Sequence, residues 1–248
     1  MARAPAPLMR RVVLVTGSTS GIGEATALRF ASAGDQVVFN SVHSVEAGER
    51  LASSTPDALY VQGDISRSED CERLIREVVA RCGQLNVLVN NAGITRKIAH
   101  KDLATANVEV WREIFEVNVF GTWNLCVAAM EELRKTNGVI VNVSSIAGLR
   151  ATGSSIPYAT SKAAVNHMTA LLAKAVGPEV RVNAVAPGLI DTPWTADWDI
   201  ERNFVTAVAP LRRSGTPEDV ADVIFLLAST PYVTGQVVTV DGGLSTAT

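Results

Sequence analysis

The sequence predicts an α/β fold in which a parallel β-sheet carries helices on both of its faces. Short β-branched runs alternate with segments of helical spacing along the whole chain, as in βαβ units. These runs are predominantly apolar, which is typical of strands buried on both faces. A glycine-rich turn joins the first run to the first helical segment. Because the 248 residues contain no internal repeat and no break in composition, we expect a single domain.

Each element follows from its local pattern. Seven runs are expected as the strands of a doubly wound, seven-stranded sheet, at residues 12–15, 36–39, 59–62, 87–89, 139–143, 180–185 and 237–240. Helical spacing is found at residues 21–33, 68–81, 108–134, 158–176 and 217–227. Thr216 is the expected N-cap of the last helix, with Pro217 in its first turn.

Three segments have further expected roles. Residues 1–10 contain Arg and Pro but no apolar core, so we expect a disordered N-terminal tail and no signal peptide. Residues 11–248 then form the domain. The stretch at about 188–210 is expected to be irregular, and a loop of that length in a compact domain is usually a lid or a substrate loop.

Composition excludes several classes of protein. A formal net charge of −3 with scattered Lys and Arg is unlike a nucleic-acid-binding surface. No apolar stretch approaches the roughly 20 residues that span a bilayer. The three cysteines and three histidines match no metal-ligand spacing, and unpaired cysteines suit a reducing compartment. We therefore expect a cytoplasmic protein without a metal, a membrane segment or a nucleic-acid partner.

The glycine-rich turn, residues 16–23, has the pattern T-G-x-x-x-G-x-G. Between a strand and a helix, such glycines let the backbone approach a pyrophosphate, which the free N–H groups of the helix N-terminus can bind. This predicts a dinucleotide site, and the alternative is a turn that only connects two elements. Residues 17–21 of the turn are also similar to the G-x-S-x-G pattern of hydrolases. However, Thr19 holds the central position, and no acid and histidine complete a triad.

A candidate catalytic group combines Tyr158, Lys162 and Ser145. Tyr158 and Lys162 are four residues apart on one helix face, where a cation is expected to lower the pKa of the phenol. Ser145 follows a strand at the carboxyl edge of the sheet, where ligands bind in this fold class. The alternative is that Tyr158 is simply half-buried and that the alkyl chain of Lys162 packs beside it. Asn118, in an apolar segment, is either part of the site or a structural hydrogen-bonding residue.

Together these residues resemble the short-chain dehydrogenase/reductase family, in its compact single-domain branch with a Rossmann fold. The resemblance covers residues 11–243. It rests on six motifs in the family's order, namely residues 16–23, N-N-A-G at 90–93, Asn118, Ser145, Y-x-x-x-K at Tyr158 and Lys162, and P-G at 187–188. The overall likeness is to 3-oxoacyl-acyl-carrier-protein reductases.

The resemblance implies an oxidoreductase that interconverts a carbonyl and a secondary alcohol by hydride transfer with NAD(P). Tyr158 would be the general acid/base, Lys162 would lower its pKa and bind the ribose, Ser145 would hold the carbonyl, and Asn118 would support a water-linked proton relay. The expected cofactor-binding residues are Gly17, Ser18, Thr19, Ser20, Gly21, Ile22, Gly23, Ser41, Asp64, Ile65, Asn91, Ala92, Gly93, Tyr158, Lys162, Pro187, Gly188, Ile190 and Thr192. Among them, Asp64 and Ile65 would border the adenine, and Ile190 and Thr192 would contact the carboxamide.

NADP(H) is favoured over NAD(H). In this fold an acid at the end of the second strand binds the ribose 2′-hydroxyl of NAD, but here that position is Ser41. We expect Ser41 and His43 to lie near a 2′-phosphate. A catalytically silent dinucleotide-binding redox sensor is the alternative function, and retention of the catalytic group argues against it.

Substrate and assembly are less constrained. Trp194, Trp198 and Phe204 suggest an apolar wall over a small-molecule or acyl-thioester carbonyl substrate, the alternative being aromatics that pin the loop to the core. The Tyr158 helix is rich in alanine on more than one side. We therefore expect a homo-oligomer, a dimer or a tetramer as is usual in the family.

Overall fold

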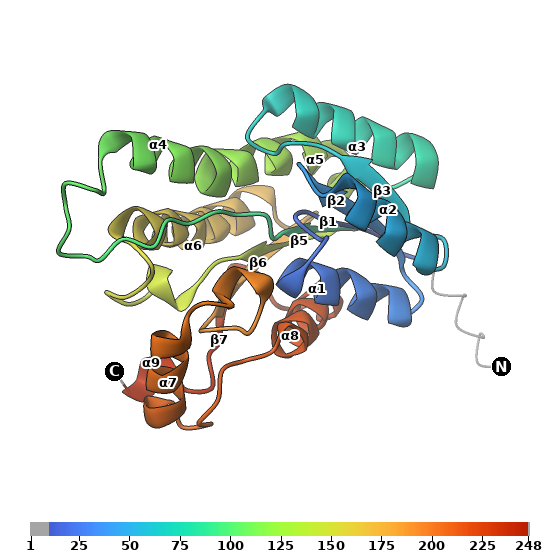
Figure 1. Cartoon of the computed structure of the whole chain (residues 1–248). Helices are drawn as coiled ribbons and strands as arrows, with labels where there is room; N and C mark the ends of the chain where they lie inside the picture. The colour runs from blue at the N-terminus through green and yellow to red at the C-terminus, as the bar shows by residue number, and fades with distance from the viewer. Residues whose placement is uncertain (1–9, 248) are drawn as a thin grey trace.

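The computed structural model describes residues 10–247 and contains a parallel seven-stranded sheet between two layers of helices (Figure 1). The strand order is β3-β2-β1-β4-β5-β6-β7, so the chain reverses direction across the sheet between β1 and β4. This confirms the predicted doubly wound fold. The strands are β1 (Val12–Val15), β2 (Gln36–Ser41), β3 (Leu59–Gln62), β4 (Val87–Asn90), β5 (Val139–Val143), β6 (Arg181–Pro187) and β7 (Val237–Val240).

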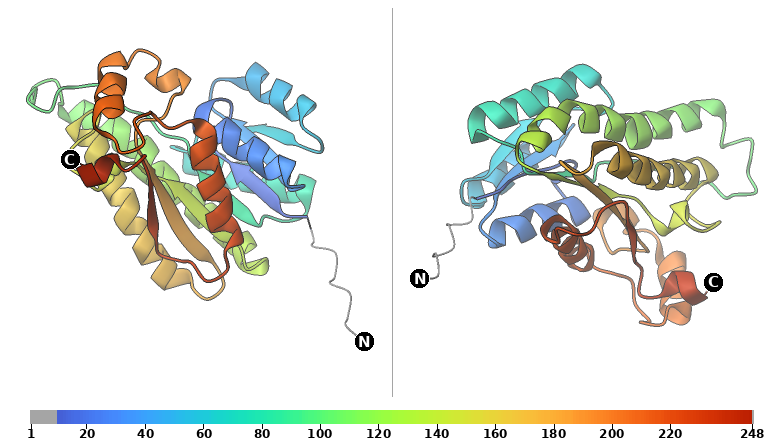
Figure 2. Two further views of the ribbon diagram at one scale, coloured as in Figure 1. Left: turned by 90° about the horizontal axis from the view of Figure 1, so that it is seen from below. Right: turned by 180° about the vertical axis from the view of Figure 1, so that it is seen from behind.

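Helices cover both faces of the sheet, with α3, α5 and α6 on one side and α1, α2 and α8 on the other (Figures 1 and 2). The α-helices are α1 (Gly21–Ser32), α2 (Val45–Ser54), α3 (Ser68–Cys82), α4 (Val108–Phe115), α5 (Thr122–Lys135), α6 (Ile156–Val176), α7 (Asp199–Val208), α8 (Pro217–Ser229) and α9 (Leu244–Ala247). A π-helical segment (Glu116–Gly121) and two 3₁₀ turns (Ile146–Gly148 and Pro193–Thr195) complete them.

Alternation along the strands explains the two layers. In β1, Val12 and Leu14 pack with α3 and α5, whereas Val13 and Val15 pack with α1 and α8. Both faces of the strand are apolar, so both must be covered to remove them from water. With both faces covered, the loops at the carboxyl edge of the sheet are left to form a ligand site.

The predicted helix over residues 108–134 is confirmed as one continuous helical run through α4, the π-helical segment and α5, but its spacing did not predict the π-helical turn. The π-helical segment separates α4 from α5 and contains Asn118 and Gly121. A Cβ added at Gly121 would lie 2.9 Å from Cγ1 of Ile65, and the side chain of Asn118 binds the backbone of Ile94. These tertiary contacts, which helical periodicity does not encode, accompany the wider turn.

We expected residues 188–210 to be irregular. Part of this segment forms the helix α7, so the prediction is wrong there. Arg202 holds this helix to the preceding loop, with Nε 2.9 Å from Asp191, Nη1 2.8 Å from Asp199 and Nη2 3.0 Å from the carbonyl oxygen of Thr195. Val205, a residue of α7, is buried. The segment is therefore helical in its second half, while its first half is irregular apart from the turn at Pro193–Thr195.

The predicted N-terminal tail falls mainly on residues 1–9, which lie outside the described residues. Arg10 is described, and its guanidinium lies 2.6 Å from Asp57 and 3.0 Å from the carbonyl oxygen of Gly34. None of the helices within residues 10–247 is long and apolar enough to span a membrane.

Candidate active site

A cavity of about 820 Å³ opens at the carboxyl edge of the sheet, and loops that follow six of the strands line it. All the predicted site residues except Ser18, Gly23 and Asn118 line this cavity. These three lie behind its wall, where their contacts shape the loops that face it. The fold thus brings together residues that are as far apart in the chain as Gly17 and Thr192.

The glycine-rich turn between β1 and α1 needs its glycines. Gly17 and Gly21 have φ angles of +59° and +57°, a region that favours residues without a Cβ. A Cβ at Gly17 would lie 2.9 Å from Cα of Ala92, and one at Gly23 would overlap the carbonyl oxygen of Gly17. The turn therefore packs too closely for side chains at these positions.

The N-terminus of α1 fits a phosphate group. Its N-cap, Ser20, makes no side-chain capping hydrogen bond, so no side chain of the cap satisfies the first N–H groups of the helix. Ser20, Gly21 and Ile22 line the cavity there. Free N–H groups and the positive end of the helix dipole suit the pyrophosphate of a dinucleotide. Ser18 is buried and structural, because its Oγ donates to the carbonyl of Val15 and accepts from the N–H of Asn40.

The N-N-A-G segment after β4 braces this turn. The amide of Asn91 donates to the carbonyl oxygens of Thr16 and Gly17 at 2.8 and 3.0 Å. Oγ1 of Thr16 in turn accepts from the N–H groups of Asn91 and Ala92, each at 3.1 Å. Asn91 also lines the cavity, so it both shapes the turn and faces the ligand space.

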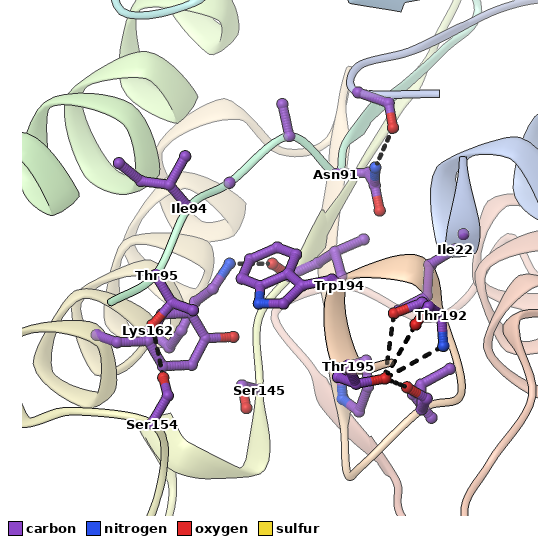
Figure 3. Close-up of a pocket in the computed structure, with 18 of the residues that line it drawn as sticks. Ile22, Asn91, Ile94, Thr95, Ser145, Ser154, Lys162, Thr192, Trp194 and Thr195 are labelled. Carbon is purple, nitrogen blue, oxygen red and sulfur yellow. Dashed lines mark hydrogen bonds between the residues drawn. The ribbon is translucent and has the colours of Figure 1, made fainter. Parts of the chain in front are cut away.

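Ser145, Tyr158 and Lys162 meet on one wall of the cavity, and Figure 3 shows Ser145 and Lys162 there. The hydroxyl of Ser145 is hydrogen-bonded to that of Tyr158 and accepts from the N–H of Ala147 at 3.1 Å. Lys162 is buried, and its Nζ donates to the carbonyl oxygen of Val143 at 2.8 Å. The carboxyl end of β5 therefore orients Lys162.

Burial sets the ionisation of this group. It raises the pKa of Tyr158 to about 12, an effect that the hydrogen bond from Ser145 only partly offsets. Burial also lowers the pKa of Lys162 to about 8. The expectation that Lys162 lowers the pKa of the phenol is therefore not met in the protein alone. The ammonium lies 5.7 Å from the centroid of the tyrosine ring, and removal from water dominates both groups.

Asn118 acts as a clamp on the loop after β4. Its Oδ1 accepts from the N–H of Ile94 at 2.8 Å, and its Nδ2 donates to the carbonyl of Ile94 and to Oγ of Ser161 at 3.0 Å each. These contacts use both amide protons and one lone pair of Oδ1, and Asn118 does not line the cavity. Of the two open alternatives, these contacts favour the structural one for the amide.

The far end of the cavity lies at β2. Ser41 is 6% exposed, and its Oγ is 2.9 Å from the hydroxyl of Tyr60. His43 and Asp64 line the same end, and Oδ1 of Asp64 accepts from the N–H and the hydroxyl of Ser66. Ser41 offers a hydroxyl and no carboxylate to a ribose, in agreement with the sequence.

The segment after β6 forms another wall of the cavity. A Cβ at Gly21 would lie 3.2 Å from Cγ2 of Thr192, so this segment touches the glycine-rich turn. Trp194, Trp198 and Phe204 all line the cavity, and Trp194 and Phe204 keep 44% and 52% of their surface exposed. Aromatics this exposed form a wall of the cavity and do not simply pin the segment to the core.

Two pairs of side chains are among the lining residues that the sequence analysis missed. The hydroxyls of Thr95 and Ser154 are 2.6 Å apart in the cavity, and Lys97 forms an ion pair of 2.9 Å with Glu201 across it. The members of each pair are 59 and 104 residues apart in the chain, and neither belongs to a motif. No local signal in the sequence joins them.

Comparisons with known proteins agree with this geometry. The family model described as enoyl-(acyl carrier protein) reductase matches residues 17–245. A protein of Streptomyces violaceoruber, named as ketoacyl reductase 2 of the granaticin polyketide synthase, is 56% identical over 94% of this chain and 95% of its own. The 3-oxoacyl-(acyl-carrier-protein) reductase FabG of Thermotoga maritima is 40% identical over 94% and 97%.

Solved structures give the same result. A protein of Burkholderia xenovorans named as a short-chain dehydrogenase/reductase superposes with a TM-score of 0.90 at 36% identity, covering 96% of this chain and 99% of its own. This chain belongs to the short-chain dehydrogenase/reductase family. The structure described as ElxO with NADP bound has a TM-score of 0.88 at 31% identity, with coverage of 96% and 100%. The protein is therefore an oxidoreductase of the short-chain dehydrogenase/reductase family, as the motifs predicted.

Proposed function

We propose that this short-chain dehydrogenase/reductase reduces the ketone of a 3-oxoacyl thioester to a secondary alcohol with NADPH. The observation that carries the proposal is that Tyr158, Ser145 and Lys162 line the same cavity as the glycine-rich turn. A cofactor bound along that turn would reach the hydroxyl groups that can hold a ketone oxygen. The names of the relatives, a ketoacyl reductase and a 3-oxoacyl-(acyl-carrier-protein) reductase, support the substrate class.

The chain's residues have distinct roles in this proposal. The bound nicotinamide cofactor supplies the hydride that reduces the carbonyl carbon. Ser145 donates a hydrogen bond to the carbonyl oxygen, and Tyr158 gives that oxygen a proton as its negative charge develops. The balance is one ketone, one NADPH and one proton consumed for one alcohol and one NADP⁺. Because the pKa of Tyr158 is raised to about 12, the phenol is protonated near neutral pH and can act as the donor.

Lys162 and the glycine-rich turn would hold the cofactor. The N-terminus of α1 would bind the pyrophosphate, and the buried ammonium of Lys162 would bind the nicotinamide ribose. Ser41 supports the preference for NADP(H), because a carboxylate at this position would repel a 2′-phosphate. His43, which lines the same end of the cavity, would lie near the phosphate. The NADP-bound neighbour also supports this preference.

The assembly is proposed to be a homo-oligomer. On α6, Ala163, Ala170 and Ala175 are exposed, and Leu171 keeps 56% of its surface exposed. On α5, Trp123 and Val127 keep 46% and 56% of their surface exposed. Apolar surface of this extent on packed helices suits a symmetric contact with a second copy. A 26.3 kDa particle in light scattering at micromolar concentration would contradict it.

The compartment is proposed to be the cytoplasm. Cys71, Cys82 and Cys126 are all free thiols, and two of them are buried. Free thiols of this kind suit a reducing environment.

The test of the function is a steady-state assay with NADPH and NADH on a 3-oxoacyl thioester, with Tyr158→Phe alongside. We expect turnover with NADPH, a fall of about 100-fold or more in kcat for Tyr158→Phe, and unchanged cofactor affinity. Tight cofactor binding without turnover on 3-oxoacyl thioesters, diketones or other ketones would favour a redox sensor instead. Equal turnover with NADH at matched concentration would refute the NADP preference.

A further inference from the structure

Two hydroxyl groups in the cavity are not used by the mechanism above. Thr95 follows the N-N-A-G segment, and Ser154 lies in the loop before α6, and Figure 3 shows their hydroxyls joined, with Oγ1 and Oγ 2.6 Å apart. The N–H of Ile98 also donates to the carbonyl oxygen of Ser154 at 2.8 Å, so the two loops are joined by their backbones. The pair is therefore fixed in place, half-buried, and open to the cavity.

The pair lies beside the catalytic side chains. Ser154 follows Gly153, at which a Cβ would lie 3.8 Å from Cδ1 of Tyr158. Thr95 comes two residues after Gly93, at which a Cβ would lie 3.5 Å from Nζ of Lys162. A substrate whose ketone oxygen contacts Tyr158 thus has these hydroxyls as neighbours for another of its polar groups.

The two hydroxyls can form more hydrogen bonds than the one between them. Two hydroxyls carry two protons and four lone pairs, and the contact between them uses one of each. If Ser154 donates in that contact, the proton of Thr95 has the carbonyl oxygen of Arg96 at 3.4 Å, which is long for a hydroxyl donor, and if Thr95 donates, the proton of Ser154 is the second one. The pair can therefore donate one hydrogen bond to an incoming oxygen and can accept from a hydroxyl.

Charges around the pair favour a neutral ligand group. Lys97 is paired with Glu201 at 2.9 Å, and Arg96 is paired with Glu113 at 2.7 Å. The cations next to Thr95 are thus already engaged with carboxylates. A free carboxylate would therefore meet cations whose charge is already balanced, whereas a neutral carbonyl or hydroxyl needs no counter-charge.

We propose that Thr95 and Ser154 form a second oxygen subsite, which binds a neutral carbonyl or hydroxyl of the substrate in addition to the reacting ketone. Trp194, whose ring centroid lies 6.4 Å from that of Tyr158, covers the chain that connects the two oxygens. The favoured substrates are ketones with a second neutral oxygen close to the reacting carbonyl. The inference rests on the proposed function and assigns the group by which the same site selects its substrate.

The test compares two ketones that differ by one oxygen, S-ethyl 3-oxobutanethioate and 4-(ethylsulfanyl)butan-2-one, in wild type, Thr95→Val and Ser154→Ala. Each variant should lower kcat/KM for the dicarbonyl by roughly 3- to 10-fold, as expected for one lost hydrogen bond, and by less than about 2-fold for the monoketone. Thr95→Ser, which keeps the hydroxyl, should restore the difference. Thr160→Val is the matched control, because Thr160 lies on the exposed side of α6 and bonds only its own helix.

The outcomes separate the two proposals. Melting temperature and NADPH affinity are measured for each variant, so that a folding defect is recognised. If a variant has such a defect, the ratio of kcat/KM between the two ketones is compared for Thr95→Ser and Thr95→Val. A parallel fall for both ketones would overturn the second oxygen subsite and leave the reductase function intact. Wild-type protein that binds NADPH but reduces neither ketone would overturn the proposed function and this inference with it.

Discussion

Replacing Lys162 with Met should make the protein more stable at neutral pH while removing its activity. Lys162 is 5% exposed, and its burial lowers its pKa from 10.5 to about 8. Below about pH 8 the ammonium is charged in both the folded and the unfolded chain, and only the folded chain holds it away from water. Between about pH 8 and pH 10.5 the folded chain has released the proton and the unfolded chain has not, so stability rises with pH in that window.

The magnitude follows from the shift. A change of 2.5 pKa units corresponds to about 3 kcal/mol of unfolding free energy lost at pH 7. Met removes this cost but also removes the hydrogen bond to the carbonyl of Val143, which subtracts about 1 kcal/mol. The net gain is about 2 kcal/mol at pH 7, or a rise in Tm of about 4–8 °C for a chain of this length. By about pH 9.5 the gain should shrink to near zero.

The assay is thermal unfolding of the cofactor-free protein, followed by circular dichroism at fixed protein concentration between about pH 6.5 and pH 9.5. Lys174→Met is the control, because Lys174 is exposed on the same helix. Its Tm should differ little from wild type at every pH. A Lys162→Met variant that is less stable than wild type at pH 7, or whose Tm difference does not change with pH, would refute the reasoning.

Three further predictions concern stability and reactivity. Gly23→Ala should cost about 1–3 kcal/mol and weaken cofactor binding, because its Cβ would overlap the carbonyl oxygen of Gly17; an unchanged Tm in calorimetry would contradict this. Burial raises the pKa of Cys71 and Cys126 to about 12, so with a disulfide reagent at about pH 8 only Cys82 should react before unfolding, and rapid titration of all three thiols would disprove it. Asp219→Ala should lower stability by about 1 kcal/mol at pH 7 through loss of the capping box. Because the folded pKa of Asp219 is lowered to about 2, this difference should fade as the pH drops from about 4 towards 2, and a constant difference in acid melts would count against it.

Much of the fold was predictable because its signals are local. The central strands β1, β4 and β5 are buried along their whole length, and short runs rich in β-branched residues are typical of strands covered on both faces. Thr216 is the N-cap of α8 as predicted, because a side-chain oxygen three residues before a free N–H is a purely local arrangement. The predicted strand of residues 180–185 extends in the structure to Pro187, and such shifts at element ends are common.

The missed parts depend on contacts between distant segments. α7 is held by Arg202 and Asp191, which are 11 residues apart, and the π-helical turn between α4 and α5 accompanies contacts of Asn118 and Gly121 with other loops. The direction of the Tyr158 pKa was also missed. A cation one turn away on the same helix is visible in the sequence, whereas removal from water is decided by what packs over the ring.

The sequence by itself determined the doubly wound sheet, the glycine-rich turn and the identity of the Ser145, Tyr158 and Lys162 group, because each depends on residue types at short spacing. Only the tertiary structure decided that Asn118 binds the backbone of Ile94 and that Thr95 and Ser154 meet. These two hydroxyls come from loops after different elements, 59 residues apart, and no local pattern encodes a contact of 2.6 Å between them. Such contacts arise from the order of strands in the sheet, which brings the loops at its carboxyl edge to one cavity.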